Sequence, residues 1–220
     1  MSTASIMRMP EDILPADPLV FIGERLWLDF VNSDDAARTR RGSRIDALDT
    51  FEGFVRWLSL ARLLDDERAT ALVVRAQQQP TGASAALHEA RRIRNVLRAL
   101  SEHGAQPVDR ATQVAIGEIN RVLGRSAGTR RVEPRADGGF VRNFVTVGDV
   151  FAGLLIPVIE SAADALVNGE LARVRRCADP RCSRVFFDGS RNGKRRWCDM
   201  ATCGNRAKAA RHRRKLKVEV

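Results

Sequence analysis

Long apolar runs are missing from this 220-residue chain, and their absence narrows the classes of protein to which it can belong. No stretch approaches the ~18 apolar residues of a membrane-spanning helix. The first residues, MSTASIMRMPEDILPADP, lack the apolar segment of a signal peptide. We therefore expect a cytoplasmic protein that does not associate with membranes. The hydrophobic fraction of 44% is ordinary, so a folded chain with a sizeable core is expected.

Recognisable catalytic motifs are missing as well. The sequence contains no G-x-S-x-G, no P-loop and no G-x-G-x-x-G. His88 and His103 have no obvious nucleophile beside them, and we interpret both as helix residues. We expect a protein that is not an enzyme.

The body of the chain has almost no net charge, whereas the last residues carry a strong excess of positive charge. Residues 1–172 contain 21 basic and 23 acidic side chains, a net charge of −2, whereas residues 173–220 contain 16 and 4, a net charge of +12. A neutral body with a basic end is typical of a protein that binds a polyanion through that end. A solvated tail that aids solubility is the alternative.

Cysteine is absent from the first 176 residues, and all four cysteines lie in the basic segment. Cys177, Cys182, Cys198 and Cys203 form two C-x4-C pairs separated by fifteen residues. Two short pairs separated by a loop of this length predict a tetrahedral zinc site, because turns within each pair can bring the sulfurs to about 2.3 Å from one ion. Four cysteine ligands leave no position for a catalytic water, so one structural zinc ion is expected.

The size of the segment supports the same prediction. Few large apolar residues lie between positions 173 and 216. They are too few for about 45 residues to fold without a cross-link such as a bound metal ion or disulfides. Disulfides are the alternative, and a reducing cytoplasm disfavours them. Replacing Cys198 or Cys203 with serine is expected to unfold this segment and to spare the rest of the chain.

Within the segment, the sequence predicts a knuckle, a hairpin and a helix in that order. Residues 184–187 read as a strand, residues 188–193 as a turn, and residues 194–197 as the returning strand. After Cys203 the chain is rich in alanine, arginine and lysine and contains no proline, which favours a helix. This order suggests a treble-clef-like finger.

A basic helix next to a zinc knuckle suits the major groove of DNA, where cations bind phosphates and an asparagine or arginine can reach a base edge. An exposed helix with solvated charges and an RNA-binding helix are alternatives. We interpret His212 as a surface residue, not a metal ligand. The candidate nucleic-acid contacts are Arg191, Lys194, Arg195, Arg196, Asn205, Arg206, Lys208, Arg211, Arg213 and Arg214.

The remainder of the chain reads as mainly helical. Apolar spacing and capping residues predict helices that begin near Asp49, near Asp65, near Ser84, and at Pro107 and Asp109. Asp137-Gly138-Gly139 lies between β-prone segments and predicts one hairpin over residues 132–147. A long apolar stripe follows over residues 150–166, and Pro157 is expected to kink or divide it.

One polar pair stands out in an apolar run near the start of the body. Asp29 and Asn32 are interpreted either as a helix cap or buried hydrogen-bond partners, or as contacts in a ligand pocket with Arg44 as a partner for an anion. Trp27 and Trp57 are interpreted as core residues.

The residues also resemble two known families. Cys203-Gly204-Asn205-Arg206, preceded by Ser190-Arg191-Asn192-Gly193 and by Arg196-Trp197-Cys198-Asp199-Met200, closely resembles the CGNR zinc finger of bacterial proteins. Residues 170–177 are similar to the lead-in of that finger, and residues 21–32 are similar to the opening of the ABATE domain that partners it. Glu24-Arg25 departs from the glycine and small residue that relatives often show. The resemblance implies a bacterial, stress-linked transcription regulator with a mainly helical N-terminal domain.

Together these observations predict a mainly α protein. We expect a flexible tail (1–16), a helical ABATE-like domain with one small β-hairpin (17–170) and a treble-clef-like four-cysteine finger (171–220). The finger would bind DNA, and the helical domain would sense a small-molecule signal or mediate association, including homo-oligomer formation. The alternative is a zinc-stabilised module that binds a protein or a small molecule without recognising DNA sequence.

Overall fold

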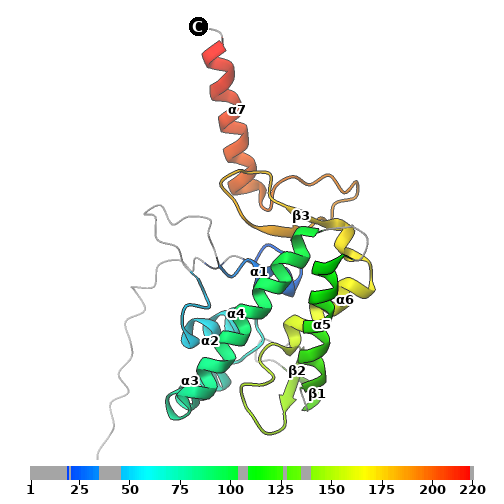
Figure 1. The fold of residues 1–220 in the computed structure, drawn as a ribbon. Coiled ribbons are helices and arrows are strands. Elements are labelled where there is room, and N and C mark those ends of the chain that lie inside the picture. The colour runs from blue at the N-terminus through cyan, green and yellow to red at the C-terminus, as the bar shows by residue number, and fades with distance from the viewer. Residues whose placement is uncertain are drawn as a thin grey trace, which may run out of the picture.

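The computed structural model describes residues 19, 21–34, 46–103, 109–125, 128–134 and 140–218 of the chain. A helical body carries a small finger at one end, and the last helix projects beyond both (Figure 1). The helices of the body are α1 (Leu26–Val31), α2 (Phe51–Leu60), α3 (Asp66–Gln78), α4 (Pro80–His103), α5 (Arg110–Arg125) and α6 (Ile156–Val167). The remaining elements are the strands β1 (Gly128–Pro134), β2 (Phe140–Thr146), β3 (Val174–Arg176) and β4 (Val185–Phe187), the short turns η2 (Glu170–Arg173) and η3 (Met200–Gly204), and the helix α7 (Asn205–Val218).

This architecture confirms the predicted fold class. The described chain is mainly helical, with two small antiparallel strand pairs, and the cysteines lie together in its C-terminal part. No helix within the described ranges combines the length and the apolar character that a bilayer span requires. The predicted tail, residues 1–16, lies outside the described residues.

The helix starts follow the capping signals with small displacements. The carboxylate of Asp65 accepts a hydrogen bond from the backbone N–H of Arg68 at 2.7 Å, and that of Asp109 accepts one from Thr112 at 2.8 Å. At α2 the cap is Thr50, whose hydroxyl accepts from Gly53, and not Asp49 as the sequence suggested. Side-chain oxygens at these positions satisfy backbone donors that the first helical turn leaves unpaired.

Two prolines begin helices in this structure. The helix expected to open near Ser84 starts four residues earlier, at Pro80. Pro157 lies in the first turn of α6, so it divides the apolar stripe at the start of that helix and does not kink the helix. Proline fits the first turn because its missing N–H would have no partner there.

The predicted hairpin of the body is present as β1 and β2, which pair antiparallel from Gly128↔Thr146 to Pro134↔Phe140. The Asp137-Gly138-Gly139 turn lies outside the described residues. The outer face of β1 is exposed, and β2 lies against α6.

One apolar core continues from the body into the finger. Trp27 and Phe30 of α1 are fully buried, and the ring of Phe30 packs edge-on against Trp57 with ring centres 5.1 Å apart. This core also contains Val185 and Phe187 of β4. The finger is therefore packed onto the body and not merely tethered to it.

The strand pairing inside the finger differs from the prediction. Val185–Phe187 pairs with Val174–Arg176, and residues 194–197 form no strand. The reason is that the other edge of β4 is already occupied by the body: the backbone N–H of Phe187 donates to the carbonyl of Gly23 at 2.9 Å, and Asn32 binds Val185. The predicted hairpin of residues 184–197 is wrong because a distant segment takes the place of its second strand.

Candidate metal centre and basic surface

The four cysteine sulfurs form a compact, buried cluster. All of them lie within 4.8 Å of one another, and the Sγ atoms of Cys182 and Cys203 are 3.7 and 3.8 Å from that of Cys198. A tetrahedron of sulfurs with metal–sulfur bonds of about 2.3 Å has edges of about 3.8 Å. The sulfur positions therefore match the edges of a tetrahedral zinc site.

The chemistry of the donor set also fits a metal ion. The cysteines are free thiols, and their separations far exceed the ~2.05 Å of a disulfide. Hydrogen bonding from Cys198 lowers the pKa of Cys182 to about 5, whereas burial raises that of Cys203 to about 11. Four buried thiolates repel one another, and a divalent cation between them removes that cost.

Each cysteine pair is closed by an aspartate. In the first knuckle, the backbone carbonyl of Asp179 accepts from the N–H of Cys182 at 2.8 Å, and its carboxylate accepts from that of Arg181 at 3.0 Å. In the second, the carboxylate of Asp199 caps η3 by accepting from the backbone N–H groups of Ala201 and Thr202. The Asp-Pro and Cys-Asp sequences thus supply the turns that a four-residue spacing needs.

Arg206 links the two knuckles. Its guanidinium lies 3.9 Å from the sulfur of Cys203 and 3.3 Å from the carboxylate of Asp179, which is only 5% exposed. Burial acts to raise the pKa of Asp179, but the N–H of Arg181 and the charges of Arg206 and Arg181 hold it below its usual value. Arg206 therefore offsets negative charge beside the metal ligands.

Two more of the predicted nucleic-acid contacts are engaged inside the finger. Arg195 donates to the carbonyl oxygens of Trp197 and Cys198, pairs with Glu24 of the body, and lies over the ring of Phe186 at 4.6 Å. The side-chain amide of Asn205 donates to the carbonyl of Ala201 at 3.1 Å. These contacts give Arg195, Asn205 and Arg206 a structural explanation that needs no nucleic acid.

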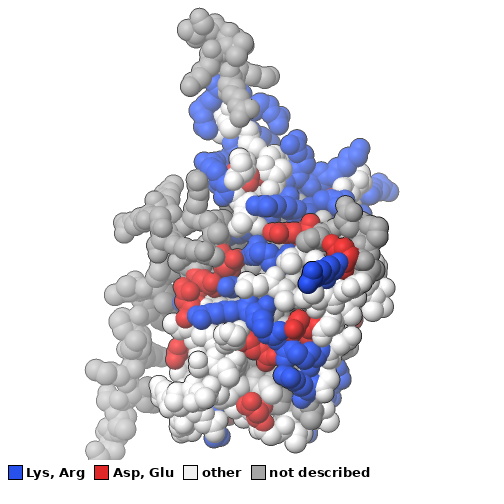
Figure 2. All heavy atoms as spheres, viewed as in Figure 1, with Lys and Arg blue, Asp and Glu red and all other residues white. Residues whose placement is uncertain are grey.

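The remaining candidates lie on the surface. We use the term basic surface for the exposed residues Arg191, Lys194, Arg196, Lys208, Arg211 and Arg213. Among the described residues, none of the six side chains makes an ion pair or a side-chain hydrogen bond. Figure 2 shows cations gathered over α7 and the finger next to it. The side chain of Arg214 lies outside the described residues.

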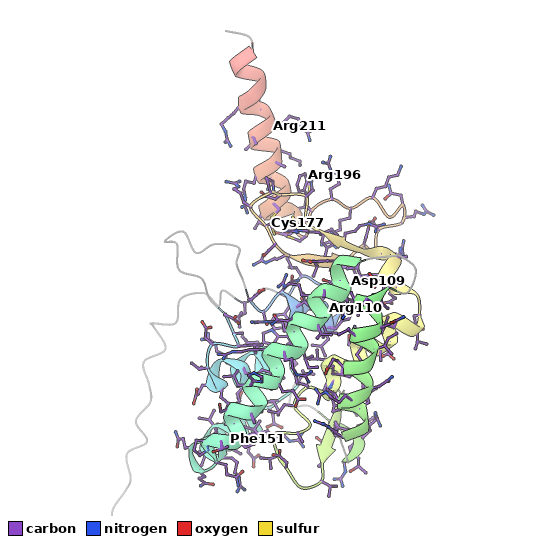
Figure 3. All side chains as sticks on the ribbon, in the orientation of Figure 1. Asp109, Arg110, Phe151, Cys177, Arg196 and Arg211 are labelled. Atoms are coloured by element: carbon purple, nitrogen blue, oxygen red, sulfur yellow. The ribbon has the colours of Figure 1, made fainter. Side chains whose placement is uncertain are left out.

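A groove of about 520 Å³ separates the first knuckle from α7. Trp197 lines it, and so do Arg196, Arg211 and Arg213 of the basic surface. In Figure 3, Arg211 lies on α7 and Arg196 lies beside the base of that helix, both above Cys177. The guanidinium of Arg196 lies 5.3 Å from the centre of the Trp197 ring, so a flat aromatic surface and several cations face the same space.

The predicted polar pair of the body serves the junction with the finger. The amide of Asn32 donates to the carbonyl of Val185 at 2.8 Å and its oxygen accepts from the N–H of Val185 at 2.9 Å, all in buried surroundings. Asp29 accepts from the N–H of Gly23 at 2.7 Å, and burial raises its pKa to about 6. Arg44, the third residue of the predicted pocket, lies outside the described residues.

Sequence reasoning missed the ion pairs that complete this junction. Arg25 binds Glu170 at 2.7 Å through two nitrogens and lies 4.0 Å from the ring centre of Phe187. Glu24 has a left-handed backbone, with φ at 60°, and its side chain reaches Arg195. The one available signal was the departure at Glu24-Arg25 from the small residues of the resembled family, because a left-handed position favours glycine.

Two family models match this chain, one over the body and one over the finger. A family model named ABATE, described as "Putative stress-induced transcription regulator", matches residues 24–169, which are more than half of the chain. A model of the CGNR zinc finger matches residues 173–215 and includes all four cysteines. No curated protein matches the sequence. The sulfur geometry and the family match together identify a site for one structural zinc ion.

Proposed function

We propose that this chain, which belongs to the ABATE family and carries a CGNR zinc finger, is a DNA-binding transcription regulator without enzymatic activity. In this proposal the zinc ion folds the finger, and the basic surface binds the phosphates of duplex DNA. The helical body senses a signal or mediates association. Zinc itself takes no chemical part, because four sulfur ligands close its coordination sphere.

The basic surface is the observation that carries the proposal. Its six cations are exposed on the finger and make no ion pair or side-chain hydrogen bond with the described residues, so they are available to a polyanion. By contrast, about half of the arginine side chains described on the body form ion pairs, for example Arg25 with Glu170 and Arg121 with Glu89 and Glu118. The zinc finger, residues 173–215, therefore carries positive charge that no acidic side chain among the described residues neutralises on the basic surface.

The shape of α7 suits the major groove. Its fourteen residues span about 21 Å, they include no acidic residue, and the helix projects away from the body (Figure 1). A helix with side chains is about 10–12 Å across, and the major groove of B-DNA is about 12 Å wide. Lys208 and Arg211 on the exposed surface of this helix would lie near phosphates on entry.

The junction supports a role for the body in regulation. Asn32, Gly23 and the Arg25–Glu170 pair fix β4 against α1, so a rearrangement at α1 would move the finger and the base of α7. Coupling between a signal and DNA would then pass through a small set of named hydrogen bonds.

The test is the salt dependence of DNA binding by the zinc-loaded protein. Each phosphate contact that is lost reduces the slope of log K against log salt by about 0.9. Replacing Lys208, Arg211 and Arg213 together with glutamine should therefore reduce the slope by about 2.7 if each side chain binds one phosphate. The matched control replaces Arg110, Arg125 and Arg131, which are exposed on the body, and changes net charge equally.

Fluorescence anisotropy with labelled genomic fragments measures both slopes. An equal effect of the two triple variants would contradict the proposal, because net charge and not the basic surface would then control binding. Binding that resists removal of the α7 cations would favour a protein-interaction module instead. Tighter binding of duplex RNA of the same sequence would overturn the choice of DNA.

A further inference from the structure

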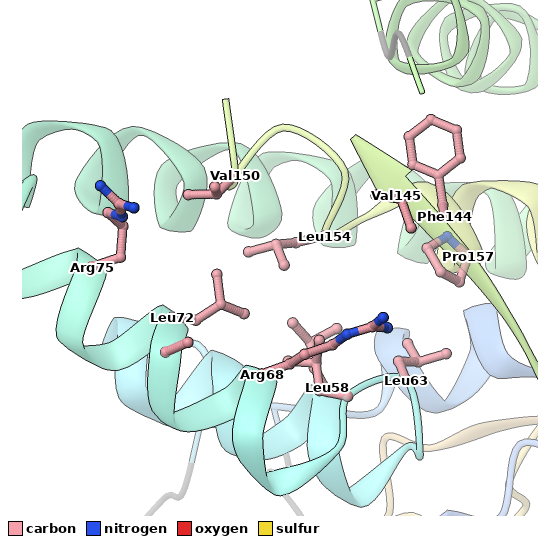
Figure 4. Close-up of a pocket in the computed structure, with 12 residues that line it drawn as sticks. Leu58, Leu63, Arg68, Leu72, Arg75, Phe144, Val145, Val150, Leu154 and Pro157 are labelled. Atoms are coloured by element: carbon pink, nitrogen blue, oxygen red, sulfur yellow. The ribbon is translucent and has the colours of Figure 1, made fainter. Parts of the chain in front are cut away.

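Besides the groove of the finger, the body contains a cavity between α3, β2 and the start of α6. Its volume is about 380 Å³, within the range of small-molecule sites. Figure 4 shows α3 along one side, with Leu154 and Pro157 facing it across the space and Phe144 and Val145 of β2 at one end. Neither Asp29 nor Asn32, the two described residues of the pocket predicted from the sequence, lines this cavity.

The lining is apolar except for two arginines. Leu58 and Leu72 are buried, and Leu154, Phe144 and Pro157 are half-buried around the opening. Water gains few hydrogen bonds against such walls, so transfer of an apolar group from bulk water into the cavity is favourable. This arrangement favours a ligand with an apolar body of small-molecule size.

The charges at the cavity are of one sign. Arg68 and Arg75 line it, and no aspartate or glutamate among the described residues does. Arg68 is held by Glu133 of β1 at 3.0 Å and by Asp65 at 3.8 Å. The guanidinium of Arg75 has no ion pair or hydrogen bond with any described residue, and it lies exposed at the end opposite Phe144 (Figure 4). A cation at the mouth of an apolar cavity selects an anion attached to an apolar group.

We propose that this cavity binds a small amphipathic carboxylate, with its apolar part between α3 and α6 and its carboxylate on Arg75. The site supplies a place for a chemical signal in the body of the protein. The proposal concerns binding alone and does not depend on whether the finger binds DNA.

Calorimetry on the zinc-loaded full chain tests the proposal with three defined probes. Octanoate should bind, and decanoate should bind about fifteenfold more tightly because two further methylenes leave water. Octanol has the same chain without the charge and should bind about fivefold more weakly than octanoate, because it cannot pair with Arg75.

Arg75 and Ala71 are both exposed, so substitutions there leave the core unchanged. Arg75→Gln should weaken octanoate about fivefold and leave octanol unchanged. Ala71→Trp, on the cavity side of α3, should abolish binding of all three probes by filling the space. Arg125→Gln removes an exposed charge on α5 and should change nothing. The helical circular dichroism of each variant should match that of the parent.

Each contrary result is informative. Equal binding of octanoate and octanol would overturn the role of Arg75. Octanoate binding that survives Ala71→Trp would place the ligand elsewhere, for example on the cations of α7. Absence of decanoate binding at millimolar concentration would remove the site altogether.

Discussion

Asn32 provides the sharpest test of how body and finger are joined. Its amide makes two buried hydrogen bonds with the backbone of Val185, at 2.8 and 2.9 Å. Leucine has a similar size but neither donor nor acceptor, so Asn32→Leu leaves the N–H and the carbonyl of Val185 without partners. An unsatisfied buried polar group costs about 1–3 kcal/mol.

For two such groups we expect the free energy of unfolding to fall by about 3 kcal/mol in the zinc-loaded protein. In a chain of this size that corresponds to a melting temperature lower by about 6–12 °C. Guanidinium unfolding followed by circular dichroism measures the first quantity, and a thermal scan measures the second. Asn120→Leu is the matched control, because Asn120 is exposed on α5.

Amide hydrogen exchange locates the effect. In Asn32→Leu the N–H of Val185 should exchange much faster than in the parent, because its acceptor is gone. A loss of less than about 0.5 kcal/mol, which is typical of surface substitutions, would refute the reasoning. Unchanged exchange at Val185 would also refute it, since the stability loss would then arise elsewhere.

Three further predictions concern the metal centre and the junction. Cys203→Ser should reduce bound zinc, measured by elemental analysis, well below one ion per chain. The sequence alone suggested that this change would spare the body, but Val185 and Phe187 belong to the core of the body, so its melting temperature should also fall. Arg206→Gln should accelerate zinc release to a chelator, because Asp179 and Cys203 lose a cation, whereas Lys208→Gln should not. Folding raises the pKa of Asp29 from 3.8 to about 6, so the stability that its protonated form contributes is present below about pH 4 and is lost as the pH rises through 6. Urea titrations should therefore show that the free energy of unfolding of the parent falls between about pH 4 and pH 6 relative to that of Asp29→Asn. Parallel pH profiles for parent and variant would contradict this last expectation.

The metal site could be predicted from the sequence because it depends on residues that lie close together along the chain. Two cysteine pairs with turn-forming residues between them allow few arrangements other than a shared ion. The caps at Asp65 and Asp109 were readable for the same reason, since each acts on a backbone N–H three residues away. Charge segregation needed only counting.

The partners of individual polar side chains were not readable, because they lie far away along the chain. Asn32 and Val185 are separated by 153 positions, and Glu24 and Arg195 by 171. Nothing in the local pattern distinguishes an arginine that binds Cys198 and Trp197 from one that faces solvent. The same limit explains the wrong hairpin, because the edge of β4 is filled by residues of the body.

By itself, then, the sequence determined the metal ligands, most of the helices and the location of the positive charge. Only the tertiary structure decided which cations remain exposed, that Asn32 joins body to finger, and that an apolar cavity opens beside Arg75. The physical reason is that spacing along the chain fixes turns and helix faces, whereas burial and pairing depend on which distant surfaces meet when the core forms.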